Sequence, residues 1–79
     1  MEEEVAENGY KPLTEFIEVA NEFAYVLLRK VQTRNGVRIE IYSPKLGYRT
    51  YLDPLQLESI TWAPEEVFDK FLETPLGPN

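Results

Sequence analysis

Alternating hydrophobic and polar residues mark the middle of the chain. Residues 22–33 are rich in aromatic and β-branched side chains and contain neither Gly nor Pro, and residues 37–42 alternate strictly. Successive side chains of a β-strand point to opposite faces, so both segments are typical of strands. The Asn35-Gly36 pair between them is a strong hairpin signal. The pattern predicts one long hairpin over residues 22–44.

The turn length fixes which residues of this hairpin face each other. A two-residue turn at Asn35-Gly36 would pair Ile39 with Gln32 and mix apolar with polar side chains on both faces. A three-residue loop over 34–36, with its glycine left-handed in a bulge, pairs Ile39 with Val31. We favour the three-residue loop, because a shift of one residue would turn the apolar side chains to water.

Shorter elements flank the hairpin. Residues 43–47 contain Pro and Gly and predict a turn, and residues 48–52 predict a third strand. Asp53-Pro54 ends that strand, and residues 58–62, which alternate loosely, predict a fourth. Residues 13–20 fit both a short helix and an extended lead-in to the hairpin.

The last element is the clearest helix. Pro64 suits a first helical position, and the two acids after it complement the helix dipole. Apolar residues form one stripe, which we expect to pack on the face of the sheet carrying Val31 and Ile39; they are Val67, Phe68, Phe71 and Leu72. The predicted fold class is α+β, a small antiparallel sheet of three to four strands with a C-terminal helix packed on one face.

Size and end composition set the domain boundaries. Residues 1–12 carry an acidic run with few side chains to bury, which predicts a disordered tail. A single α+β domain then spans residues 13–75, and residues 76–79 are a frayed C-terminus. A domain this small buries only about 60% of the surface that its unfolded chain exposes, so we expect marginal stability unless the domain associates.

Two residue types that serve many active sites are missing. The chain has no Cys and no His, so it offers no thiolate, no disulfide and none of the commonest general bases or metal ligands. Its glycines, at positions 9, 36, 47 and 77, are never two apart, which excludes the dinucleotide-binding fingerprint. Glu65 and Glu66 are typical of a helix start. We expect no catalytic residue, no metal site and no cofactor.

The expected cellular location follows from the lack of a membrane span and of a signal peptide. No apolar run approaches the ~20 residues of a membrane span, and the acidic start has the wrong charge for a signal peptide. We therefore expect a soluble cytoplasmic protein.

Charge is segregated along the chain. Residues 1–22 hold seven acids and one Lys, residues 29–49 six bases and one acid, and residues 53–79 six acids and one Lys. One interpretation is that the acidic segments neutralise the basic hairpin. The other is a patch that docks an acidic partner or an anionic ligand, made of Arg29, Arg38 and Arg49. Nucleic acid is the poorest partner for it, since the whole chain is acidic.

Aromatic residues supply candidate contacts. Tyrosines on strands are typical of cores or interfaces more than of base stacking. Trp62 suits a core position between sheet and helix first, and an interface second. The candidate interface anchors are Tyr25, Tyr42, Tyr51 and Trp62, while Tyr48 is a further strand tyrosine.

Several runs resemble short bacterial chains named dihydrodiol dehydrogenase. The resemblance covers roughly residues 19–78 and rests on Ala20-Asn21-Glu22-Phe23-Ala24-Tyr25-Val26, Arg29-Lys30-Val31, Thr33-Arg34-Asn35-Gly36, Ser43-Pro44-Lys45-Leu46-Gly47-Tyr48-Arg49 and Leu57-Glu58-Ser59-Ile60-Thr61-Trp62. It implies oxidation of an aromatic cis-diol with a nicotinamide cofactor and assigns no catalytic residue.

The sequence as a whole favours a non-catalytic function. We expect a small protein-interaction or accessory domain that self-associates, most simply as a dimer, or that serves a larger oxidoreductase. Two alternatives stay open: a small oxidoreductase or oxidoreductase subunit of aromatic catabolism, and an anion-binding module that uses the basic hairpin.

Overall fold

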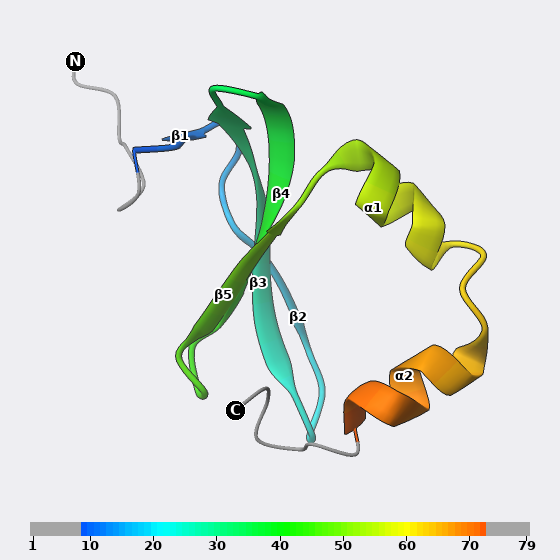
Figure 1. Cartoon of the computed structure of the whole chain (residues 1–79). Helices are drawn as coiled ribbons and strands as arrows, with labels where there is room; N and C mark the ends of the chain where they lie inside the picture. The colour runs from blue at the N-terminus through cyan, green and yellow to red at the C-terminus, as the bar shows by residue number, and fades with distance from the viewer. Residues whose placement is uncertain (1–8, 73–79) are drawn as a thin grey trace.

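One antiparallel sheet and two helices make up the fold, which the computed structural model of the chain describes over residues 9–72 (Figure 1). The strands are β1 (Lys11–Pro12), β2 (Ile17–Ala20), β3 (Tyr25–Thr33), β4 (Gly36–Ser43) and β5 (Tyr48–Leu52), and the helices are α1 (Pro54–Ile60) and α2 (Glu65–Leu72). The strand order is β1-β3-β4-β5, and β2 also pairs with β3. The predicted α+β class is confirmed, with a C-terminal helix over one face of the sheet.

The central hairpin forms as predicted, but with a different register. Its loop is Arg34-Asn35, and Thr33 lies opposite Gly36, so Ile39 faces Lys30. Both of the loops that we weighed are therefore wrong. The Thr33 hydroxyl closes the turn, because it accepts the Asn35 N–H at 3.1 Å and donates to the Gly36 carbonyl at 2.8 Å. Gly36, with φ +115°, begins β4 in a conformation that other residues rarely adopt.

This register separates two residues that we had placed on one face. Val31 lies opposite Arg38, and Ile39 lies opposite Lys30, so Val31 and Ile39 point to opposite sides of the sheet. The apolar face, which the helices cover, carries Ile17, Val19, Val26, Leu28, Ile39, Ile41, Tyr48 and Leu52. The charged face, on the other side, carries Arg29, Val31, Arg38, Glu40, Tyr42, Arg49 and Tyr51.

The segment before the hairpin is extended, so its helical alternative is wrong. Residues 17–20 pair with β3 as β2, and Lys11 and Pro12, which we had assigned to the tail, pair with β3 as β1. Thr14 joins the two pieces, because its hydroxyl accepts the Lys30 N–H at 3.0 Å. Residues 1–8, the rest of the predicted acidic tail, lie outside the described residues.

The predicted fourth strand over residues 58–62 is wrong, because α1 occupies residues 54–60. Asp53 caps this helix: its side chain accepts the Gln56 N–H at 2.7 Å, and the Gln56 side chain accepts the Asp53 N–H at 2.9 Å. Pro54 takes the first helical position. Asp53 and Pro54, which we interpreted as the end of the third strand, thus also begin a helix, and Asp53 forms a capping box with Gln56.

The third strand, its turn and the C-terminal helix are confirmed. Gly47, with φ +77°, donates its N–H to the Ser43 carbonyl at 2.8 Å and leads into β5. Helix α1 contacts β4 and β5, whereas no Cα atom of α2 comes within 8 Å of another strand or helix in residues 9–72. The apolar side of α2 therefore covers the sheet only from a distance. The predicted helix end at residue 74 lies outside the described part of the chain.

Candidate functional site

A buried carboxylate joins the three longest strands on the charged face. Glu40 on β4 is fully buried, and its Oε1 accepts the Nε–H of Arg29 at 2.7 Å. Its other oxygen, Oε2, lies 3.0 Å from the Nε of Arg49 on β5. Arg29 is itself only 8% exposed. The one acid of the basic block thus neutralises two of the block's arginines.

Aromatic rings hold both guanidinium groups in place. The Cζ of Arg29 lies 4.1 Å from the centre of the Phe16 ring, and the Cζ of Arg49 lies 4.2 Å from that of Tyr42. At these distances the positive group is attracted to the face of the ring. Ring and carboxylate together orient each arginine, so the cluster is part of the packed structure of the charged face.

Arg38 is arranged differently from the other two arginines. Its Nη1 donates to the carbonyls of Val37, at 3.0 Å, and Asn35, at 3.4 Å, at the turn end of the hairpin. It borders an open hollow of about 570 Å³ with Tyr10 and Arg34. The structure therefore joins Arg29 and Arg49 through Glu40 but places Arg38 against the turn.

Tyr51 lies next to this cluster and contains an unsatisfied polar atom. It faces Glu40 across the β4–β5 pair, and its ring meets that of Tyr10 edge to face, with the centres 4.9 Å apart. Its hydroxyl is buried and has no hydrogen-bond partner among the residues described. A buried hydroxyl without a partner is costly, so this atom lowers the net stability of the charged face.

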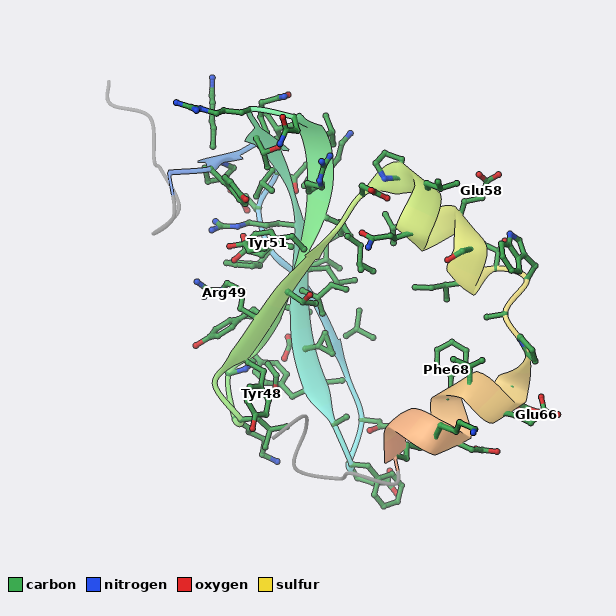
Figure 2. All side chains as sticks on the ribbon, viewed as in Figure 1. Tyr48, Arg49, Tyr51, Glu58, Glu66 and Phe68 are labelled. Atoms are coloured by element: carbon green, nitrogen blue, oxygen red, sulfur yellow. The ribbon has the colours of Figure 1, made fainter. Side chains whose placement is uncertain are left out.

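Burial is concentrated on the charged face. The buried residues of the described chain are Arg29, Val31 and Glu40, and all three lie on that face. Figure 2 shows Arg49 and Tyr51 on the side away from the helices, while Phe68 points from α2 into the space between helices and sheet. The core of this domain is therefore a charge cluster with one fully buried valine.

The apolar face, in contrast, is incompletely covered. Ile17 and Val19 on β2 are 61% and 52% exposed, and Phe68 on α2 is 39% exposed. Hollows of about 240 Å³, between Ile39 and Leu57, and about 390 Å³, between Ile41 and Tyr48, open along it. Further exposed large apolar residues are Leu13, Phe16, Phe23, Leu46, Leu55, Leu57, Ile60, Trp62 and Leu72.

The candidate anchors divide into two groups. Tyr25, Tyr42 and Tyr51 are half-buried on the sheet. Trp62 is 72% exposed in the connection between α1 and α2, so the predicted core position for it is wrong, while its role in an interface stays a prediction. Tyr48, which we had not chosen as an anchor, is an exposed aromatic residue at the start of β5 and lies on the apolar face.

Sequence reasoning missed Glu40, although a signal for it exists. A lone acid among six bases, in a strand of alternating residues, is typical of a cross-strand ion pair. Phe16 was missed because its segment had no settled secondary structure.

Within residues 9–72, no helix is long and apolar enough to cross a membrane, and no three acidic side chains gather in a way that could hold a metal ion. Comparisons with protein-family models, with curated proteins and with solved structures find no match to this chain.

Proposed function

We propose that this chain is a small, non-catalytic, cytoplasmic protein-interaction domain that self-associates. The observation that carries the proposal is the contrast between its two faces. One valine is the only fully buried apolar residue described, while thirteen large apolar side chains in the same residues are exposed. Scattered apolar residues are normal on a surface, but an apolar sheet face lined with them marks an interaction site.

Energetics support association over a solitary domain. Burying a large apolar side chain contributes about 1.5–3 kcal/mol, and the described residues contain very few that are buried. Domains of this length are marginal even with an ordinary core. A partner that covers the apolar face supplies the missing burial and stabilises the fold by mass action.

The basic residues support this function less well. Arg29 and Arg49 already face Glu40, and each stacks on a ring, so an acidic partner would compete with a buried carboxylate for them. Displacing a buried ion pair is costly, because the abandoned charge stays in the interior. Of the three arginines of the predicted patch, only Arg38 lies outside this cluster.

Sedimentation velocity over a range of concentrations tests the proposal. We expect the sedimentation coefficient to rise between about 1 µM and about 1 mM, a range that covers weak and moderate dimers. Because apolar contacts are not screened, sodium chloride should not reverse the association. A constant monomer across this range refutes self-association, and dissociation in salt supports a charge-driven interface instead.

The resemblance to dihydrodiol dehydrogenase chains leaves a separate prediction. If the domain binds a nicotinamide cofactor, or is a subunit that helps to bind one, calorimetric titration of the chain with NAD and NADP should show saturable heat. Absence of heat removes the oxidoreductase alternative for the isolated chain and leaves the accessory role open. Co-purification with a larger oxidoreductase from the native cell would favour that role.

A further inference from the structure

The two edges of the sheet differ in how open they are to another strand. On one side, β1 and β2 have two and four residues and are interrupted by residues 13–16, and β1 contains Pro12. Short pieces and proline are common protections of a sheet edge. On the other side, β5 runs for five residues with neither Pro nor Gly and has β4 as its one strand neighbour within residues 9–72.

The composition of β5 is typical of a strand that pairs on both sides. Its sequence is Tyr48-Arg49-Thr50-Tyr51-Leu52, in which Tyr and Thr are strong strand formers. Tyr48 and Thr50 are exposed. An edge strand presents unpaired N–H and C=O groups, and a free strand of this kind is a template for another chain.

We propose that two copies of this chain pair antiparallel through β5, about a two-fold axis at Thr50, so that their sheets form one continuous sheet. This proposal rests on the self-association proposed above and gives it a register at the β5 edge, which extends the apolar face across two copies but does not itself cover that face. In this register Thr50 faces Thr50 of the second copy, and Tyr48 faces Leu52. Arg49 then faces Tyr51.

Each of these pairs suits its face of the sheet. Tyr48 and Leu52 belong to the apolar face, so their contact continues that face across the two copies. On the charged face, Arg49 of one copy lies beside Tyr51 of the other, which is half-buried. Directly opposed Cβ atoms lie about 4.5–5.5 Å apart, so the guanidinium group reaches the tyrosine ring.

Other registers fit less well. A pairing of odd with even residues would place the apolar face of one copy beside the charged face of the other. An axis at Arg49 would set two like charges directly opposite each other. An axis at Tyr51 would leave Tyr48 without an opposite strand residue and would engage Asp53, whose side chain already caps α1. The axis at Thr50 alone uses all five residues of both strands.

Disulfide trapping tests the register, and the chain suits it because it contains no Cys. Antiparallel neighbours have Cα atoms about 4.5–5.5 Å apart, within the range that a disulfide spans. We therefore expect Thr50→Cys to form a covalent dimer readily under mild oxidation. Tyr48→Cys is the matched control, because position 48 of each copy lies four residues, or about 13 Å, from position 48 of the other.

A mixture of two cysteine variants tests the same register independently. Tyr48→Cys and Leu52→Cys should each stay mostly monomeric on oxidation, but together they should form a mixed disulfide dimer. If wild-type protein self-associates in sedimentation while Thr50→Cys traps no more dimer than Tyr48→Cys, the β5 pairing is refuted and self-association stands. If wild-type protein is a monomer throughout, both are refuted.

A charge placed on each edge tests the surface without cross-linking. Thr50→Lys would set two Lys side chains opposite each other at the axis, and we expect it to weaken association about ten-fold. Ala20→Lys, on exposed β2 but on the charged face, adds the same charge to the other edge and should leave association unchanged. Circular dichroism of both variants checks that the sheet is intact. Equal weakening by the two variants, or weakening by Ala20→Lys alone, overturns the proposal.

Discussion

Glu40 is the residue on which the charged face depends. It is fully buried, and it faces Arg29 and Arg49 through separate oxygens. Taking a carboxylate out of water costs several kcal/mol, and only close positive partners offset that cost. The net contribution of such a cluster to stability is small, but the loss of one member leaves uncompensated charge in the interior.

Glu40→Gln should therefore be strongly destabilising. We expect the free energy of unfolding to fall by about 3–5 kcal/mol, because Arg29 stays buried without its carboxylate. Urea unfolding followed by circular dichroism measures the change. Glu18→Gln, which removes an exposed carboxylate from β2, is the control and should shift stability by less than about 0.5 kcal/mol.

A second variant separates charge from packing. Replacing the whole cluster, as Arg29→Met, Glu40→Leu and Arg49→Met together, removes the charges and keeps most of the volume. Apolar replacements of a complete buried ion cluster are often neutral or stabilising, so this variant should be more stable than Glu40→Gln. A triple variant less stable than Glu40→Gln would show that shape, and not charge compensation, dominates at this site.

At the scale of elements, α1 depends on its first residues. Its seven residues include no buried side chain, so little packing supports it. The reciprocal bonds between Asp53 and Gln56 satisfy two backbone N–H groups that a helix start otherwise leaves open. The helix thus exists because of a local motif, in a segment whose loose alternation also fits a strand.

Asp53→Ala should lower the free energy of unfolding by about 1 kcal/mol, the usual cost of losing an N-cap side chain. Thermal unfolding followed at 222 nm measures the effect. Asp53→Asn retains an accepting oxygen and is expected to recover most of the stability, whereas equal losses for Ala and Asn would point to the charge and not to the cap.

The hairpin turn gives a second prediction at this scale. Gly36→Ala should destabilise the protein by about 1–2 kcal/mol, because its φ of +115° is unfavourable for a residue with a Cβ atom. Space is not the cause, since an added Cβ atom would meet Arg38 Nη1 at an ordinary 3.6 Å. Asn35→Ala, in the same turn but without a positive φ, should change stability by less than about 0.5 kcal/mol.

At the scale of the whole molecule, packing contacts between the elements are unevenly distributed. The central strands β3 and β4 contact each other, β3 also contacts β1 and β2, and β4 also contacts β5 and α1. Helix α2 stands farther away, and its Leu72 is 71% exposed. Regions with few packed contacts open locally at a fraction of the free energy of global unfolding.

Hydrogen exchange should therefore reveal a gradient of stability. We expect the slowest amide exchange in β3 and β4, and exchange in α2 that is at least about ten-fold faster, equivalent to about 1.4 kcal/mol. Residue-resolved exchange by NMR at low protein concentration measures this. Protection in α2 equal to that of β3 would mean that the helix is held to the sheet as firmly as the strands are to each other.

The candidate site could be predicted only in part. The block of residues 29–49 revealed the concentration of bases, and it contained the acid that neutralises two of them. What it did not reveal is that Arg38 turns to the hairpin loop while Arg29 and Arg49 meet Glu40, because that depends on the strand register. Exposure of Trp62 likewise depends on how α1 and α2 are placed.

The sequence by itself determined the local elements: the two arms of the hairpin, the turn with Gly47, the strand at residues 48–52, the terminal helix and the lack of Cys and His. These follow from side-chain period and backbone preference, which act within a few residues. The tertiary structure alone decided the register, the pairing of residues 17–20 with β3 and the separation of Val31 from Ile39. Alternation shows which residues of one strand share a face. Which residues of the neighbouring strand lie on that same side of the sheet is set by turn closure and by cross-strand pairs such as Arg29 with Glu40.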